Sequence, residues 1–246
     1  MMHGAPMSPI SATLLLNAYR SGLFPMADSR GQDEVYWVEP RERAIIPLDG
    51  FRCSRSLAKA IRQERFAVTC NAAFPQVIDA CAAPRPDHPE TWISHRIEAS
   101  YRALHKAGHA HSIECWQGGA LVGGLYGVGF ERAFCGESMF SAVRDASKVA
   151  LAWLVVLLGR AGYRLLDCQF MTEHLASVGA VAISRDDYLR LLAGAVAAGP
   201  ARGLPEAYAS LVASAAAPVS PPDSAGVPEG SSSPGKLIAQ SLTQTS

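Results

Sequence analysis

Three short blocks in the second half of this chain constrain its fold more than any other feature. In chain order they are LVGGLYGV (121–128), FCGESMFS (134–141) and LLDCQF (165–170). Each block has the composition of a buried strand, yet the second and the third each contain an acid. A buried carboxylate without a partner is costly, so acids in such places are usually paired or used in chemistry. Glu137 and Asp167 are therefore the first candidates for a functional site.

Composition narrows the possible classes of protein. The 246 residues are 49% hydrophobic, which is enough for one large domain or two modest ones. Formal charges balance to zero, so contact with a nucleic acid would need a local basic patch. Residues 41–65 offer one, with seven basic and three acidic residues, and it includes Arg55, Lys59 and Arg62. A solvated helix face has the same composition, and both interpretations stay open.

Cysteine spacing and the N-terminal residues indicate a cytosolic (cytoplasmic) protein. The six cysteines form no CxxC pair and several lie in apolar runs, as reduced core thiols do. The first ten residues lack a basic region followed by an apolar one, so we expect no secretory signal. The longest apolar run, residues 149–158, is half the length of a membrane span and fits a buried helix.

Hydrophobic periodicity and capping residues divide the chain into helices and strands. The expected helices cover residues 13–20, 54–64, 74–82, 95–107, 146–160, 173–178 and 185–197. The expected strands cover residues 36–37, 43–48, 66–70, 111–116, 120–128, 132–140, 163–170 and 181–183, and segment 22–31 predicts a loop. An antiparallel meander followed by β-α-β-α elements predicts an α+β (mixed α/β) fold with a mixed sheet. Residues 215–246, rich in Pro, Ser and Gly, predict a disordered tail.

Asp167 and Gln169 lie two positions apart in the expected strand 163–170. Residues two apart in a strand share a face, so the carboxylate and the amide should project together. Such a pair could supply a base or an anchor beside a group that both donates and accepts hydrogen bonds. A hydrogen-bonded acid at a strand end would give the same pattern, and these residues alone do not separate the two.

Glu137 lies within the expected strand 132–140. Strict alternation places it on one face with Cys135 and Met139, and places Phe134 and Phe140 on the other. Both faces are apolar, so the carboxylate must find a donor or border a cavity.

Two tryptophans, Trp37 and Trp92, stand beside proline-bearing loops instead of inside apolar periodic runs. A tryptophan in that position can stack on a base or ribose, or it can pin a loop to the core. Two other kinds of site are disfavoured. His109 and His111 lack a third ligand at metal spacing, and Ser138 lies outside a G-x-S-x-G turn.

Many blocks occur in the order found in leucyl/phenylalanyl-tRNA–protein transferases, and over about residues 10–195 the chain resembles that family. The blocks are GLFP (22–25), YWVEPRERAIIPL (36–48), FRCSRSL (51–57), TWIS (91–94), YRALHKAGHAHSIECW (101–116), the three blocks above, DASKVAL (145–151) and HLASVGA (174–180). The resemblance implies a bacterial cytosolic enzyme that moves leucine or phenylalanine from its tRNA to the N-terminal Arg or Lys of a protein, which marks that protein for degradation. It also implies a small N-terminal domain, residues 1–50, and an acetyltransferase-like (GNAT-like) catalytic domain, residues 51–200.

The resemblance also assigns roles to single residues. Asp167 and Gln169 match the family's proposed catalytic pair, in which the acid acts through the amide to help deprotonate the attacking α-amino group. Trp37 and Trp92 match tryptophans that hold the terminal adenosine of the tRNA.

Leu125, Phe134 and Glu137 match positions around the pocket for the aminoacyl side chain. The family often has Met where this chain has Leu125, a near-isosteric change. It often has FPW where this chain has FPM (24–26), so no role is assigned to Met26. Leucine and phenylalanine, and with them methionine, are the aminoacyl groups that we expect.

The implied reaction needs little beyond its two substrates. An aminoacyl ester is already activated, so we expect no ATP, no metal and no other cofactor. The enzyme must place an amine near the ester carbonyl and keep that amine neutral. The expected partners are aminoacyl-tRNA, whose backbone would meet Arg55, Lys59 and Arg62, and proteins with N-terminal Arg or Lys, with no membrane.

Two other functions are alternatives. An acyl-CoA N-acetyltransferase on the same fold would need a glycine-rich pyrophosphate loop at a helix N-terminus, and the segment SAVRDASK before the expected helix 146–160 has no glycine. A non-catalytic RNA-binding module could use Trp37, Trp92 and residues 41–65, but it leaves the two acids unexplained.

Overall fold

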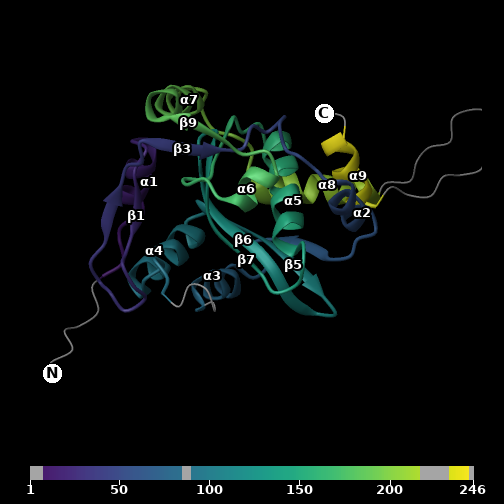
Figure 1. The fold of residues 1–246 in the computed structure, drawn as a ribbon, viewed down its shortest axis with the longest axis horizontal. Coiled ribbons are helices and arrows are strands. Elements are labelled where there is room, and N and C mark those ends of the chain that lie inside the picture. Colours follow the sequence, from purple (N-terminus) through teal and green to yellow (C-terminus); the bar gives the residue numbers. More distant parts are fainter. Residues whose placement is uncertain (1–7, 85–89, 217–232, 244–246) are drawn as a thin grey trace, which may run out of the picture.

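A seven-stranded sheet forms the centre of the structure (Figure 1). The computed structural model describes residues 8–84, 90–216 and 233–243. The strand order is β4-β5-β6-β7-β8-β3-β9, and β7 and β8 are parallel while the other neighbours are antiparallel. The strands are β3 (Glu42–Ile45), β4 (Ala67–Cys70), β5 (Ala110–Gln117), β6 (Ala120–Phe130), β7 (Ala133–Ser141), β8 (Leu165–Asp167) and β9 (Val181–Ser184). The predicted mixed α/β fold with a mixed sheet is confirmed, and its likeness to acetyltransferases stays a prediction.

Helices cover both faces of this sheet and divide the core into two apolar clusters (Figure 1). One face carries α2 (Arg55–Arg62), α5 (Ala146–Ala161), α6 (Glu173–Ser177), α8 (Leu204–Ala216) and α9 (Pro234–Thr243). The other carries α1 (Ala12–Arg20), α3 (Phe74–Ala82), α4 (His95–Lys106) and α7 (Arg185–Ala197). None of the helices in the described ranges is long and apolar enough to cross a membrane.

Serine caps start four of these helices. The hydroxyl oxygens of Ser11, Ser54, Ser94 and Ser184 each accept a hydrogen bond from the backbone N–H three residues further along the chain. Such caps satisfy one of the amide groups that the first turn leaves without a helical partner. The helices expected at residues 13–20 and 54–64 begin within one residue of the observed starts of α1 and α2.

Helix α5 joins β7 to the parallel strand β8 and is buried along nearly its whole length. It packs on the sheet with one side and against α2, α8 and α9 with the others, and Figure 1 shows these helices grouped beside it. This surrounding explains why its sequence is apolar nearly all round.

The N-terminal region holds a second, two-stranded sheet that the sequence did not reveal. Strand β1 (Phe24–Met26) pairs antiparallel with β2 (Tyr36–Val38), although the predicted loop 22–31 covered β1. Proline in a three-residue strand removes the usual pattern, and pairing with β2 supplies what local preference lacks. Strand β3 pairs with β8 and β9 in the main sheet, so a domain boundary at residue 50 would cut through that sheet.

The C-terminal region corrects a second expectation. Residues 215–246 were expected to be disordered, but α8 extends to Ala216 and α9 packs on α2, α5 and α8. Ile238, Ala239 and Leu242 of α9 are buried in the core. The Pro, Ser and Gly content of the whole segment hid this short amphipathic stretch. Residues 217–232 and 244–246 lie outside the described residues.

Candidate active site

A cavity of about 620 Å³ opens where the parallel strands β7 and β8 part. The two strands pair only from Ala133↔Leu165 to Cys135↔Asp167. Beyond that point the remainder of β7, the turn after β8, β1 and the adjoining parts of α5 and α6 form the wall. The carboxyl ends of parallel strands are a recurrent place for ligands, because the chain diverges there. The wall is mainly apolar, with Glu137 and Gln169 among its polar groups.

A β-bulge sets the direction of Glu137. On β6 and β7, Tyr126 pairs with Ser138 and Gly127 pairs with Gly136, which leaves Glu137 as an extra residue without a partner. A bulge of this kind bends the strand and aims one side chain differently from its neighbours. It places Glu137 at the wall of the cavity.

The same bulge reverses the alternation of β7 and corrects the predicted faces. Phe134 and Met139 belong to one core cluster, whereas Cys135 and Phe140 belong to the other. The expectation that Cys135 and Met139 share a face, and that Phe134 and Phe140 share the opposite one, is wrong. One inserted residue moves every later side chain to the other side of the sheet.

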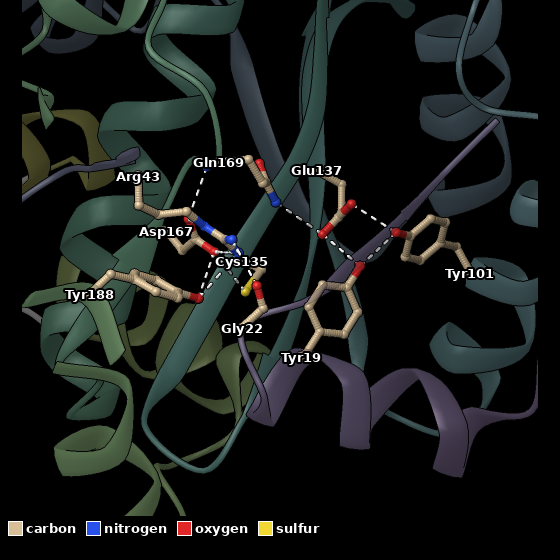
Figure 2. A network of polar contacts seen from close by, with 9 residues as sticks. All are labelled: Tyr19, Gly22, Arg43, Tyr101, Cys135, Glu137, Asp167, Gln169 and Tyr188. Atoms are coloured by element: carbon tan, nitrogen blue, oxygen red, sulfur yellow. Dashed lines mark hydrogen bonds and ion pairs between the residues drawn. The ribbon is translucent and has the colours of Figure 1, made fainter. Parts of the chain in front are cut away.

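Glu137 is held by neutral donors (Figure 2). Tyr19 Oη donates to Oε1 at 2.8 Å, and Tyr101 Oη donates to Oε2 at 2.8 Å. The amide Nε2 of Gln169 also donates to Oε1, at 3.3 Å. Burial raises the pKa of Glu137 from its ordinary value of 4.5 to about 7, although the hydrogen bonds from both tyrosines oppose the rise.

Asp167 has a different set of partners. Its side chain is fully buried and forms a two-point ion pair with Arg43, with Nε to Oδ1 at 2.9 Å and Nη2 to Oδ2 at 2.7 Å. Tyr188 Oη donates to Oδ2 at 3.0 Å, and the backbone N–H of Gln169 donates to Oδ1 at 2.9 Å. Of the residues that the structure describes, the cavity wall includes Glu137 and Gln169 but not Asp167.

Gln169 leaves the strand that was expected to contain it. Strand β8 ends at Asp167, and Gln169 has the left-handed φ of +57°. The predicted strand 163–170, with Asp167 and Gln169 on one face, is therefore wrong. A left-handed residue other than glycine costs roughly 1–2 kcal/mol, and the charge-assisted bond from its N–H to Asp167 offsets part of that cost. The turn points the amide side chain at Glu137 instead of at Asp167.

Comparison with known proteins identifies the family of this chain. The family model described as "Leucyl/phenylalanyl-tRNA protein transferase" matches residues 45–193, and the model of the N-terminal domain of the same transferase matches residues 8–41. The chain belongs to the leucyl/phenylalanyl-tRNA–protein transferase family.

Relatives of the same name show how much of the chain this covers. The leucyl/phenylalanyl-tRNA–protein transferase of Novosphingobium aromaticivorans is 58% identical over 96% of this chain and 97% of its own length. That of Rhizorhabdus wittichii is 61% identical over 78% of this chain and 81% of its own length. A solved structure of L-PGS from Bacillus licheniformis aligns at 15% identity over 69% of this chain and 56% of that one, with a TM-score of 0.38, which supports no argument.

The two candidate tryptophans of this family member lie in different places. Trp92 lines the cavity, whereas Trp37 borders a separate surface groove. Trp37 pairs with Pro25, so its side chain leaves the β1–β2 ribbon on the face opposite to Phe24 and Met26. Phe24 and Met26 both line the cavity. Only Trp92 of the two therefore lines the cavity, and the adenosine-binding role expected of both stays a prediction. Met26 takes a wall position that the sequence did not indicate.

The two candidate pocket residues also separate. Leu125 lines the cavity as expected. Phe134 is fully buried in the core and packs edge-on against Tyr163, with ring centroids 6.1 Å apart. Phe134 therefore supports the sheet beneath the cavity and does not form its wall.

The basic candidates lie on one side of helix α2. Arg55, Lys59 and Arg62 are spaced four and three residues apart, so they share a face, and all three are exposed. None of them is among the described residues that line the cavity. Arg43, which counted toward the same basic segment, is only 2% exposed and belongs to the buried ion pair.

Sequence reasoning missed the groups that hold the two acids. Tyr19 and Tyr101 occupy apolar positions of α1 and α4, where an aromatic residue reads as core. Arg43 of β3 and Tyr188 of α7 lie 145 residues apart in the chain, and only folding brings both to Asp167. Only the three-dimensional structure shows that the buried hydroxyls of Tyr19 and Tyr101 meet at the Glu137 carboxylate.

Proposed function

We propose that this enzyme transfers leucine or phenylalanine from aminoacyl-tRNA to the N-terminal Arg or Lys of acceptor proteins and so forms a new peptide bond. Family membership supports the class of reaction. The observation that carries the proposal is Glu137 on the wall of an apolar cavity, bonded to an amide that lines the same wall. The cavity would bring together an apolar aminoacyl group and an amine.

The apolar part of the cavity suits a leucyl or phenylalanyl side chain. Its wall includes aliphatic residues from the sheet and from the helices α5 and α6, namely Leu125, Leu151, Leu154, Leu166 and Leu175. A volume of about 620 Å³ lies within the usual range of small-ligand sites. Burial in such a wall favours apolar side chains and rejects charged ones, because a charge without a partner loses its hydration there.

Glu137 suits the proton transfer that the reaction requires. The α-amino group of a protein ordinarily has a pKa of about 7.7–8.0, so it arrives mostly as an ammonium. A carboxylate whose pKa is about 7 can take that proton near neutral pH. The neutral amine then attacks the ester carbonyl carbon, the new C–N bond forms and the C–O bond to the ribose breaks. The attacking nitrogen gives up its second proton, and the ribose oxygen takes up that proton as it leaves.

Gln169 and Asp167 keep a place in this mechanism, with changed roles. Gln169 donates to Glu137 and lines the cavity, so we assign it to the group that faces the amine. Asp167 bonds the backbone of Gln169 and pairs with Arg43, so we assign it to positioning and not to direct proton transfer.

The tRNA would approach through Trp92 and helix α2. Trp92 offers a ring at the cavity for stacking on the terminal adenosine, and Met26 lines the wall with it. The exposed face with Arg55, Lys59 and Arg62 would contact phosphates and position the tRNA without reading its sequence.

One assay tests the proposal against its alternatives. The purified chain is mixed with leucyl-tRNA and a peptide with N-terminal Arg, and the peptide mass is followed. We expect addition of one leucyl residue, and no addition to the same peptide with an acetylated N-terminus. Acetylation of the free peptide from acetyl-CoA, or tRNA binding without transfer, would contradict the proposal.

A further inference from the structure

We propose that Arg43 is a positioning residue that fixes both hydrogen-bond donors to one oxygen of Glu137. The inference rests on the proposed function, because it concerns the same cavity. Oε1 of Glu137 accepts two hydrogen bonds, one from Tyr19 Oη and one from Gln169 Nε2. Figure 2 shows the guanidinium of Arg43 in contact with both Asp167 and Gly22.

One connection runs through Asp167 to Gln169. Arg43 donates from two nitrogens to the two carboxylate oxygens of Asp167. Oδ1 of Asp167 also accepts a hydrogen bond from the backbone N–H of Gln169 at 2.9 Å. The neighbouring residue Ala44 adds two backbone hydrogen bonds. Its N–H donates to the carbonyl oxygen of Gln169 at 3.0 Å, and the carbonyl oxygen of Ala44 accepts from the N–H of Cys168 at 2.8 Å. The left-handed turn that aims the Gln169 amide is therefore built against Arg43 and its strand.

The other connection runs through Gly22 to Tyr19. Arg43 Nη1 donates to the carbonyl oxygen of Gly22 at 2.9 Å, and the N–H of Gly22 donates to the carbonyl of Tyr19 at 3.0 Å. Gly22 has a φ of +80°, and a Cβ there would lie 3.0 Å from a methyl carbon of Leu189. Arg43 thus holds the end of helix α1, which carries the Tyr19 hydroxyl.

The guanidinium group is suited to this double task. It is planar and presents donors in fixed directions, so one group can bind Asp167 with two nitrogens and Gly22 with the third. Rings of Phe24 and Tyr188 enclose it, with the guanidinium carbon 4.8 and 4.3 Å from their centroids. A lysine would keep the charge but would reach only one of the two partners well.

Several groups around Glu137 bear on its charge. They are Tyr19 of α1, Tyr101 of α4, Tyr126 of β6, Cys135 of β7, Asp167 of β8 and Arg43 of β3. The donors from Tyr19 and Gln169 favour the charged carboxylate, so their misplacement should raise the pKa of Glu137 further.

The test measures single-turnover transfer against pH in Arg43→Lys and in the control Tyr188→Phe, which removes a different bond to Asp167. We expect Arg43→Lys to slow transfer about a hundredfold at saturating aminoacyl-tRNA, with little change in KM, and to move the pH midpoint above that of the wild type. Tyr188→Phe should keep the wild-type midpoint even where its melting temperature falls. An unmoved midpoint in Arg43→Lys, with loss in proportion to unfolded protein, would overturn the proposal.

A second variant guards against a failure to fold. In Arg43→Met/Asp167→Leu the buried ion pair is replaced by apolar groups, a change that often leaves stability intact. We expect this protein to melt near the wild-type temperature but to transfer as slowly as Arg43→Lys. A folded double variant that transfers at the wild-type rate would overturn the proposal.

One further readout separates this inference from the proposed function. ¹³C NMR of the labelled Glu137 carboxyl reports its titration without any transfer reaction. If the wild type transfers no residue, the proposed function fails, while the comparison of midpoints between wild type and Arg43→Lys still decides the role of Arg43. A midpoint that is equal in both proteins would overturn that role.

Discussion

Two carboxylates on neighbouring strands of one sheet have opposite surroundings. Asp167 on β8 contacts a guanidinium, a tyrosine hydroxyl and a backbone N–H. It is not among the described residues that line the cavity. Glu137 on β7 faces two tyrosine hydroxyls and an amide, and it lines the cavity. The charge of Asp167 is neutralised by a permanent partner, whereas that of Glu137 has only dipoles to support it.

The difference shows that the partner, and not burial alone, decides what a buried acid can do. An ion pair with a two-point fork fixes an anion and makes it part of the framework. Neutral donors leave the proton affinity of the carboxylate high, and an open cavity gives a substrate access to it. A third acid, Glu114, shows that access matters as well, since it is fully buried and bonds Thr69 and Ser112 away from the cavity.

The largest effect should follow from Glu137→Gln. We expect transfer to fall by about 10²–10⁴-fold, the usual loss when an acid–base group is removed. The unfolding free energy at pH 8 should stay the same or rise. The pKa of Glu137 is about 7 in the folded protein and near 4.5 in the unfolded chain. Ionisation of Glu137 therefore lowers the unfolding free energy as pH rises from about 4.5 to about 7, and the full loss persists above pH 7.

The measurements for Glu137→Gln are single-turnover transfer and chemical denaturation of the same preparation. Active transfer by a well-folded variant would break the contrast between the two acids, because Glu137 would then be a structural group.

Asp167→Asn should act mainly on stability. The substitution leaves the guanidinium of Arg43 buried without its counter-ion, which costs about 3–5 kcal/mol of unfolding free energy. Denaturant titration at pH 7 checks this, with Glu137→Gln as the matched acid-to-amide control. If Asp167→Asn were as stable as the wild type and inactive, Asp167 would take over the chemical role that we give to Glu137.

A smaller effect separates the two tryptophans in the same way. Trp92→Ala should weaken binding of an aminoacyl-nucleoside mimic by about 1–3 kcal/mol, because a stacking ring at the cavity is lost. Trp37→Ala, whose ring lies on the far face of the β1–β2 ribbon, should leave that inhibition constant unchanged. Equal losses in both variants would mean that the bound nucleoside extends beyond the cavity.

Much of the fold could be predicted from the sequence because its signals are local. Apolar periodicity and capping residues located α1, α2, α4, α5 and α7, and the composition of the three blocks located strands of the main sheet. Helix α9 escaped because a Pro, Ser and Gly-rich average masked ten residues whose order depends on packing against α2 and α5. Strand β1 escaped because only its pairing with β2 makes it a strand.

The sequence singled out the two acids of the candidate site but not the contacts that hold them. Burial of two acids in apolar blocks singled out Glu137 and Asp167 from composition alone. A one-residue bulge and a left-handed turn then decided where Glu137 and Gln169 point, and neither has a clear local signal. Arg43, the ion-pair partner of Asp167, lies 124 residues earlier in the chain, so no local pattern links the two.

The account depends most on the state of the Glu137 carboxyl. Its direct test is a ¹³C NMR titration of protein labelled at the glutamate side-chain carboxyls, with Glu137→Gln used to assign the resonance. We predict that one glutamate carboxyl titrates with a midpoint at about 7 and that this resonance is missing from the variant. A Glu137 resonance that titrates near the ordinary value of 4.5 would contradict the account, because the carboxylate could not then take the proton of the incoming amine.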